Sequence, residues 1–276
     1  MKEVKLQDIC YHHNHNSGSG IQNNSKPEPS LSLHFDDGLA YGLGFFETIL
    51  LTEVPHLLVA HVKRINHSLQ QFQLGRYITA ETVASVIQHY GLHHCALRLQ
   101  ITEKNAFITT RPLSHTYANR YNRLSLTVSP VRKSSTSPLI QHKSCNYGEN
   151  LLSLRAAKPQ GYDDCLFLNE NGYLTESSVA NIFIIHKGKL YTPPVEDGLL
   201  PGVLRKELIK HYPVEEKHLT LHDLLHGEGA FLTNSLMGIK GITMIDGTAL
   251  DSHPLIKEII EWHYRTFVAA DAFWHS

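Results

Sequence analysis

The chain has 276 residues, of which 42% are hydrophobic and 18% are charged. This length suits two modest domains or one large one, and the composition allows a buried core. The formal net charge of −1 gives no electrostatic reason to expect nucleic acid or an anionic membrane surface as a partner.

Four cysteines lie far apart and form no C-x-x-C pair: Cys10, Cys95, Cys145 and Cys165. This pattern argues against a disulfide framework or a zinc knuckle and suits a reducing compartment. The first ten residues lack the apolar core of a signal peptide. No apolar run approaches the roughly 18 residues that span a bilayer. We therefore expect a cytoplasmic protein with no membrane partner.

Residues 11–30 are polar and of low complexity, so we expect them to be flexible and ordered sequence to begin near Leu31. Four potential metal ligands lie in or beside this segment: Cys10, His12, His13 and His15. Their spacing matches no known type of site and no downstream cluster completes it, so no metal is expected.

Hydrophobic periodicity predicts the following elements in chain order. The first half contains a strand at 45–52, a helix within 61–74, a helix at 80–90 whose inward residues include Tyr90, and a strand at 96–102. A linker within 111–122, a strand at 124–128 and a loop at 129–138 come next. The second half contains a helix after Lys143, a strand–turn–strand unit around the N-E-N-G turn, and a strand at 181–185. A helix opened by Pro201-Gly202, a short helix at 221–226, a strand at 230–233 and a last helix through Leu255, Ile259, Ile260 and Phe267 complete the chain.

This order mixes antiparallel hairpins with helices, which favours an α+β fold over a doubly wound parallel sheet. We expect an N-terminal domain at 1–114, a linker at 115–122 and a C-terminal domain at 123–276. Between Gln141 and Asn181, one lysine (Lys143) and one glutamate (Glu176) lie on a helix–strand–turn–strand unit. That pair suggests Schiff-base chemistry, with the carboxylate tuning the ring nitrogen of a cofactor. The helix start at Pro201-Gly202 would offer free N–H groups to an anion.

Six sequence blocks carry a family resemblance: Y-G-L-G-F-F-E-T, H-V-K-R-I, H-K-S-C-N-Y, N-G-Y-L-T-E-S-S-V-A-N-I-F, T-P-P-V-E-D-G-L-L-P-G-V-L-R and T-N-S-L-M-G-I. In this order the chain resembles the class IV, or fold-type IV, pyridoxal-phosphate enzymes. These include branched-chain aminotransferases, D-amino acid aminotransferases and aminodeoxychorismate lyases. The resemblance implies a smaller N-terminal α/β domain, a larger C-terminal pseudo-barrel domain that binds the cofactor, and a homodimer.

The resemblance also implies roles for single residues. Lys143 matches the Schiff-base lysine that acts as acid and base, and Glu176 matches the acid that pairs with the pyridine nitrogen. The phosphate is expected to contact Arg64, the backbone of Val203 and Leu204, and the loop of Asn234 and Ser235.

The spacing from Lys143 to Asn146 and the T-N-S-L-M-G-I turn are most similar to aminodeoxychorismate lyase. That activity converts 4-amino-4-deoxychorismate to 4-aminobenzoate and pyruvate and supplies folate synthesis. The alternatives are an aminotransferase for D- or branched-chain amino acids, and a homologue that binds the cofactor without catalysis.

Two departures from the family pattern affect the substrate side. Leu43 replaces the acid of the usual Y-G-D-G, and the usual T-R-G loop is I-T-E-K-N-A, which looks shortened. Glu103 and Lys104 substitute poorly for that loop's arginines, so Arg98 or Arg111 would have to bind substrate carboxylates. Thr48 is expected to face the substrate.

Overall fold

The structure is a computed structural model that describes residues 1–13, 33–113 and 119–268. Contacts between residues divide the chain into two units. Unit 1 comprises Met1–Ser114 together with Lys143–Asn146, and unit 2 comprises His115–His142 together with Tyr147–Ser276. Each unit is described by itself. No helix within the described ranges has the length and hydropathy that a membrane crossing needs.

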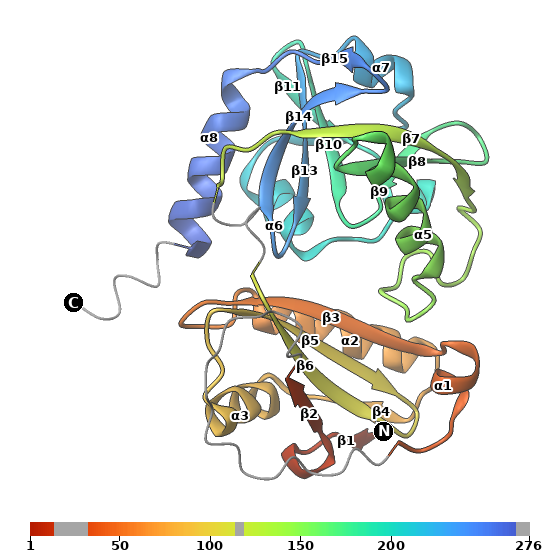
Figure 1. Cartoon of the computed structure of the whole chain (residues 1–276), viewed down its shortest axis with the longest axis vertical. Helices are drawn as coiled ribbons and strands as arrows, with labels where there is room; N and C mark the ends of the chain where they lie inside the picture. The colour runs from red at the N-terminus through yellow and green to blue at the C-terminus, as the bar shows by residue number, and fades with distance from the viewer. Residues whose placement is uncertain (14–32, 114–118, 269–276) are drawn as a thin grey trace. The chain divides into compact units, whose positions relative to one another are not determined.

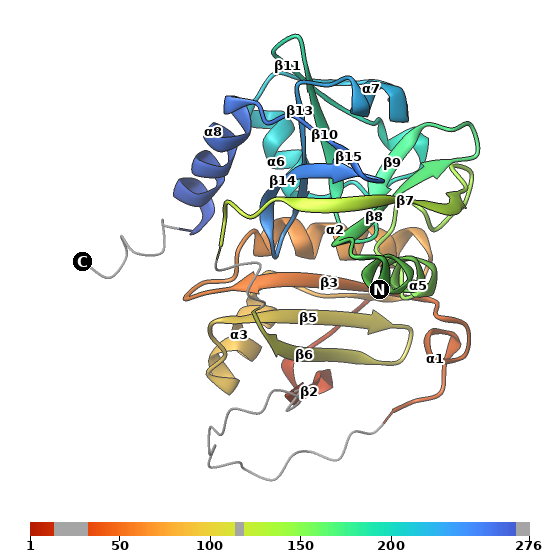
Figure 2. The ribbon, with the colours of Figure 1, turned by 45° about the horizontal axis from the view of Figure 1, so that its top comes forward.

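Unit 1 is built on a four-stranded sheet in the order β2-β6-β5-β3 (Figure 2). Its strands are β2 (Cys10–His13), β3 (Gly44–Leu51), β5 (Cys95–Thr102) and β6 (Ala106–Pro112). The short strands β1 (Lys2–Glu3) and β4 (Arg76–Tyr77) pair separately in parallel. β3 pairs with β5 along its whole length, and side chains alternate between the two faces.

Three helices accompany this sheet: α1 (Asp37–Tyr41), α2 (Leu58–Gln71) and α3 (Ala80–Tyr90). α2 packs on β3 through Val62, Ile65 and Leu69, which repeat at helical spacing and are buried. α3 begins at Thr79, whose side chain accepts a hydrogen bond from the Thr82 N–H, and it ends at Gly91 in the left-handed conformation.

The segment Lys143–Asn146 lies along the edge of β3. The Phe46 N–H donates to the Lys143 carbonyl at 2.8 Å, and the Cys145 N–H donates to the Gly44 carbonyl at 2.8 Å. Gly42 adopts φ +74° at the end of α1, and a Cβ there would lie 2.8 Å from Asn146 Oδ1. Gly42 therefore provides both the left-handed turn and the close approach of this segment.

Unit 2 contains a nine-stranded sheet that closes on itself. Its strands are β7 (Leu124–Lys133), β8 (Asp164–Asn169), β9 (Leu174–Ser177), β10 (Asn181–His186), β11 (Lys189–Thr192), β12 (Val214–Glu216), β13 (Gly229–Asn234), β14 (Gly238–Ile245) and β15 (Thr248–Ala249). The path β10-β13-β14-β7-β8-β9 becomes a ring because Glu176 of β9 pairs back onto Asn181 of β10. The expected α+β fold with a C-terminal pseudo-barrel is confirmed.

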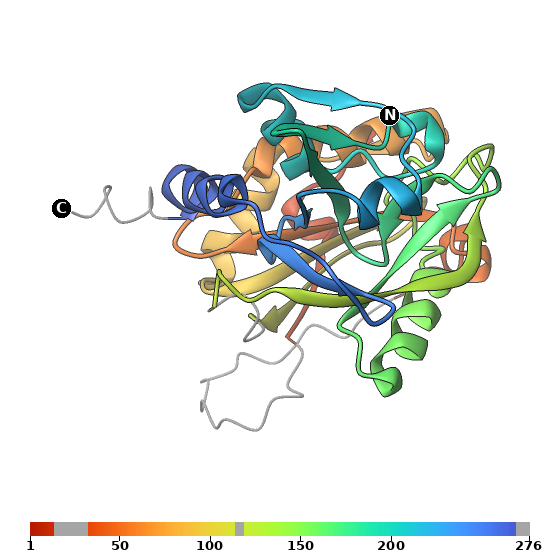
Figure 3. The same ribbon diagram turned by 90° about the horizontal axis from the view of Figure 1, so that it is seen from above.

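The helices of unit 2 are α5 (Gly148–Ala157), α6 (Val203–His211), α7 (Leu221–Leu225) and α8 (Pro254–His263). α6 packs on β13, and α8 packs on β13 and β14. α5 and α8 lie on opposite sides of the unit (Figures 1 and 3). The apolar core between α6, α8 and the sheet includes Phe183 and Phe231, which stack with ring centroids 5.1 Å apart.

Several predicted elements were wrong. Residues 11–13, which were predicted to be flexible, belong to β2 because their backbone pairs with β6. Arg111 lies within β6, a strand that the sequence did not predict. β7 continues to Lys133 instead of ending in a loop at 129–138, since Arg132 and Lys133 pair with β8 across an irregularity in register. Tyr90 is exposed, and its ring stacks on Tyr11 with centroids 4.4 Å apart.

Candidate active site

One face of the unit 1 sheet brings together the lysine and the two expected substrate residues. Phe46 and Thr48 point to the same face of β3, and Arg98 lies opposite Thr48 in β5. The Phe46 ring carries two cations: Arg98 Cζ lies 3.7 Å and Lys143 Nζ 4.5 Å from its centroid. Arg98 also donates to the Gln100 side chain at 3.1 and 3.3 Å. The Lys143 amine is thus held over an aromatic ring beside a guanidinium.

Arg64 lies on the other side of β3, on α2, and binds a carboxylate that the sequence reading did not single out. Its Nε donates to Glu47 Oε1 and its Nη2 to Glu47 Oε2, both at 2.7 Å. His61, one helical turn earlier, places Nδ1 2.6 Å from Glu47 Oε2. The Arg64 side chain is 9% exposed, and those of Glu47 and His61 are at most 1% exposed.

Burial and charge set the protonation of this group. Burial alone would raise the pKa of Glu47, but the charge of Arg64 and the hydrogen bonds from Arg64 and His61 outweigh it and bring the pKa to about 2. Burial lowers the pKa of His61 despite the opposing charge of Glu47. The cluster therefore combines a carboxylate, a guanidinium and a neutral imidazole.

In unit 2, Glu176 lies where the barrel closes. Its Oε2 accepts hydrogen bonds from the Leu200 N–H at 3.2 Å and from Asn181 Nδ2 at 3.3 Å. Asn181 Nδ2 also donates to the Leu200 carbonyl at 2.8 Å. The sequence places Glu176 one short turn before β10, so antiparallel pairing returns Asn181 to its side. These contacts fix the orientation of the carboxylate.

The start of α6 lies against the same asparagine. A Cβ on Gly202, the residue before the helix, would be 2.1 Å from Asn181 Oδ1. Gly202 has no side chain to cap the helix, and the first-turn N–H groups, including those of Val203 and Leu204, have no acceptor within the helix. This turn therefore offers backbone donors and a positive dipole end.

Asn234 is the last residue of β13, the strand beside β10, and Ser235 follows it in the next turn. Asn234 Oδ1 accepts from the backbone N–H groups of Leu236 and Met237 at 2.9 and 2.8 Å, which shapes the turn. Thr233 lies opposite Asn181 in the strand pairing, and its Oγ1 is buried without a hydrogen-bond partner among the described residues. A buried hydroxyl without a partner is unusual and fits a ligand that supplies one.

The residues of unit 2 fit the cofactor implied by the resemblance. An oriented carboxylate (Glu176) suits a pyridine nitrogen. The α6 start, the Asn234–Ser235 turn and the unpartnered Thr233 hydroxyl suit a phosphate. In unit 1, the resemblance would assign the amine to Lys143 and a phosphate-binding guanidinium to Arg64.

The hairpin between β5 and β6 explains the altered substrate loop. Only Glu103–Asn105 connect the two strands. Asp36 holds this turn, accepting from Thr102 Oγ1 at 2.5 Å, from the Lys104 N–H at 2.9 Å and from Asn105 Nδ2 at 3.0 Å. Burial opposes ionisation of Asp36, but these hydrogen bonds lower its pKa. The connection is therefore a short, fixed turn whose side chains include no arginine.

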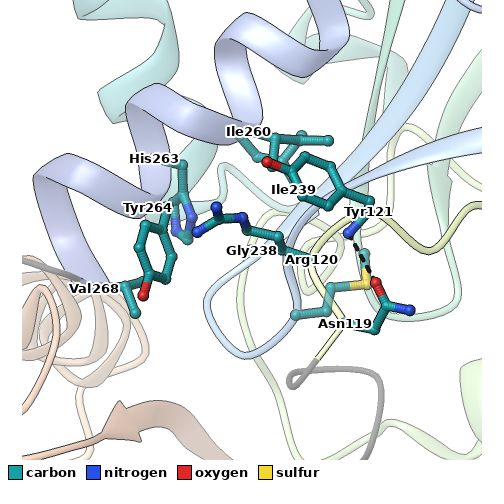
Figure 4. A pocket seen from close by; sticks show the side chains of 10 residues that line it. Asn119, Arg120, Tyr121, Gly238, Ile239, Ile260, His263, Tyr264 and Val268 are labelled. Atoms are coloured by element: carbon teal, nitrogen blue, oxygen red, sulfur yellow. Dashed lines mark hydrogen bonds between the residues drawn. The ribbon is translucent and has the colours of Figure 1, made fainter.

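A separate cavity of about 430 Å³ lies in unit 2 and contains none of the expected site residues (Figure 4). Arg120 Cζ lies 4.0 Å from the centroid of the Tyr264 ring within it. The other lining residues are Asn119, Tyr121, Met237, Gly238, Ile239, Ile260, His263 and Val268. Cys10–His13 lie in β2, and His15 lies outside the described residues, so the His-rich segment adds no described ligand cluster.

The sequence reading missed Glu47, His61, Asp36 and Asn181. The first two had a usable signal. His61 and Arg64 are three residues apart on one helix face, and Glu47 is an acid inside an otherwise apolar strand. Asp36 and Asn181 gave no comparable signal, because partners that define their roles, such as Thr102 and Leu200, lie far from them in sequence.

Comparisons with known proteins agree with this geometry. The family described as amino-transferase class IV matches residues 44–245. The aminodeoxychorismate lyase of Bacillus subtilis is 26% identical over 77% of this chain and 80% of its own length. A Methanocaldococcus jannaschii protein provisionally named a branched-chain-amino-acid aminotransferase is 28% identical over 79% of this chain and 84% of its own.

A solved structure from Legionella pneumophila is similar over nearly the whole chain. It is provisionally named a 4-amino-4-deoxychorismate lyase and is 27% identical, with a TM-score of 0.77. The match covers 93% of this chain and 99% of that one.

Proposed function

The chain belongs to the class IV aminotransferase family, and we propose that it is the pyridoxal-phosphate-dependent lyase that converts 4-amino-4-deoxychorismate to 4-aminobenzoate and pyruvate. The cofactor is pyridoxal phosphate. One observation carries the proposal on the substrate side: Arg98 lies over the same Phe46 ring as Lys143. This arrangement offers a fixed cation to a carboxylate of a dicarboxylic substrate whose amine-bearing carbon loses its proton to Lys143.

Bound pyridoxal phosphate supplies an electron sink for negative charge that develops at the substrate carbon bearing the amine. Lys143 Nζ removes the proton from that carbon. The carbon–oxygen bond at the neighbouring ring carbon then breaks, and the side chain leaves as enolpyruvate, which takes up a proton to become pyruvate. Aromatisation of the ring favours this step. Glu176 would pair with the ring nitrogen of the cofactor and keep it protonated.

The relatives also favour an aminotransferase as the second candidate, because the archaeal relative carries that provisional name. Branched-chain and D-amino acids present one carboxylate, which Arg98 could equally bind. A third candidate is a homologue that binds the cofactor but does not turn over. It is motivated by Leu43 and by the short turn at Glu103–Asn105, where family members have substrate-binding arginines.

An assay for 4-aminobenzoate, with substrate supplied by a coupled synthase, separates these candidates. We expect the wild type to form 4-aminobenzoate, and we expect Lys143→Ala to form none and to lose the absorbance band of the lysine-bound cofactor. Formation of pyridoxamine phosphate from an amino-acid donor, without 4-aminobenzoate, would overturn the lyase in favour of the aminotransferase. Cofactor binding without turnover of any amine would leave the third candidate.

The role of Arg98 is tested by substitution. We expect Arg98→Ala to raise KM at least ~10-fold with a smaller change in kcat, because a charge-assisted contact to the substrate is lost. Arg111→Ala tests the other arginine of this sheet, and Arg155→Ala on α5 is the matched control. Equal KM values for Arg98→Ala and Arg155→Ala would remove Arg98 from the site.

A further inference from the structure

The Glu47–His61–Arg64 cluster joins β3 to α2 by three short hydrogen bonds. Both carboxylate oxygens of Glu47 are used, one by Arg64 Nε and the other by Arg64 Nη2 and His61 Nδ1, at 2.6–2.7 Å. Two parallel N–H donors on one carboxylate form the planar, bidentate geometry that fixes a guanidinium in orientation as well as in position.

His61 contributes a single hydrogen bond to the cluster. The neutral ring must donate from Nδ1, because the carboxylate can only accept. Nε2 then has no proton, is buried and has no hydrogen-bond partner among the described residues. An unsatisfied buried nitrogen costs about 1–3 kcal/mol, so packing on α2 alone does not explain a histidine there.

Stability alone does not account for this cluster. Buried ion pairs are often replaced by apolar residues of similar volume without loss of stability, because desolvation offsets the attraction. The cluster does, however, preset one side chain. The pair with Glu47 holds the guanidinium through two of its nitrogens, Nε and Nη2. This pair also restrains the long Arg64 side chain in advance, so that the side chain loses less rotamer freedom when it binds an anion.

We propose that Glu47 and His61 are positioning residues that hold the Arg64 guanidinium ready for the cofactor phosphate. The inference rests on the expectation that Arg64 contacts that phosphate, and it is independent of whether the enzyme is a lyase or an aminotransferase.

The test compares two ligands of the apoprotein, pyridoxal phosphate and pyridoxal, which lacks the phosphate. Kd is measured for both by absorbance titration of the wild type, Glu47→Gln, His61→Asn and Arg64→Ala. We expect Glu47→Gln to raise the Kd for pyridoxal phosphate by about 10- to 100-fold and the Kd for pyridoxal by less than ~2-fold. The reason is that only the contact between Arg64 and the phosphate depends on the bidentate pair with Glu47. His61→Asn keeps the charges of Glu47 and Arg64 and should raise the Kd for pyridoxal phosphate ~3- to 10-fold.

Glu53→Gln is the matched control, because Glu53 pairs with His94 at 2.8 Å on the exposed surface of the same unit. It should leave both Kd values unchanged. Circular dichroism and thermal unfolding of each apoprotein establish that the variants fold. If Glu47→Gln does not fold, His61→Asn carries the same comparison.

The outcomes separate the inference from its premise. If Arg64→Ala keeps the full preference for pyridoxal phosphate over pyridoxal, Arg64 is not a phosphate ligand, and the premise and the inference both fail. If Arg64→Ala removes that preference while Glu47→Gln and His61→Asn retain it, the arginine needs no positioning and the inference alone fails. Equal weakening of both ligands by Glu47→Gln also overturns it, since that result indicates general damage to the site.

Discussion

At the scale of single residues, Glu176 is held by two donors on one oxygen, the Leu200 N–H and the Asn181 amide. We expect Glu176→Gln to keep the shape of the site and to lose the negative charge that maintains protonation of the cofactor's ring nitrogen. The rate should fall ~100-fold or more, and the absorbance of the bound cofactor should change. Glu170→Gln, at an exposed carboxylate in the preceding turn, is the control, and equal rates for both variants would contradict the assignment.

Glu47 makes a prediction about acid stability. Its folded-state pKa of about 2 lies below the ordinary value of 4.5. Its contribution to stability is therefore fully present above about pH 4.5 and is lost as pH falls towards 2, a change on the order of 3 kcal/mol. Denaturant unfolding of the apoprotein between pH 5 and 3, on wild type and Glu47→Gln, measures this. The wild type should lose its advantage as pH falls, and an advantage that does not depend on pH would refute the shift.

At the scale of elements, the start of α6 depends on a residue without a side chain. A Cβ on Gly202 would meet Asn181 Oδ1 at 2.1 Å, and Asn181 in turn contacts Glu176. Gly202→Ala must therefore move either the helix start or the asparagine. We expect a loss of about 1–3 kcal/mol of stability and at least ~10-fold weaker binding of pyridoxal phosphate.

Gly148→Ala is the matched control for this change. Gly148 is the first residue of α5, and a Cβ there meets nothing within 4 Å. Unfolding curves and cofactor titration of both variants decide the matter. If Gly202→Ala binds the cofactor as the Gly148→Ala protein does, the helix start does not hold the phosphate.

At the scale of the whole molecule, unit 1 exposes large apolar side chains within a few residues of one another. Phe35 is 75% exposed, Tyr41 76% and Leu39 55%. Such a group on a folded surface is typical of an interface. We propose that the chain forms a homodimer through this segment.

Light scattering after size exclusion should give a mass of about 62 kDa, twice the 31.2 kDa of one chain. The double substitution Phe35→Ser with Tyr41→Ser should shift the mass towards one chain. Leu152→Ser, at a side chain 65% exposed on α5, is the control. A wild type that elutes as a single chain at micromolar concentration would exclude the dimer.

Sequence pattern alone was sufficient for elements whose signals are local. α3 was predicted with its bounds, because the buried Val83 and Val86 and the terminal Gly91 lie close together in sequence. The pairing of Lys143 with Glu176 as candidate residues came from two motifs, and their roles came from a resemblance. The cofactor expectation needed no tertiary contact, because the resemblance that implies it rests on motifs in the sequence.

Tertiary structure alone decided the features that depend on partners distant in sequence. β2 formed inside a polar segment because β6 pairs with it, and β7 extended to Lys133 because β8 supplies its hydrogen bonds. Periodicity reports what a strand buries, but it does not report the partner that satisfies its backbone. For the same reason the role of Glu47, although it is an acid inside an apolar strand, became evident only where α2 packs on β3 and brings Arg64 and His61 to it.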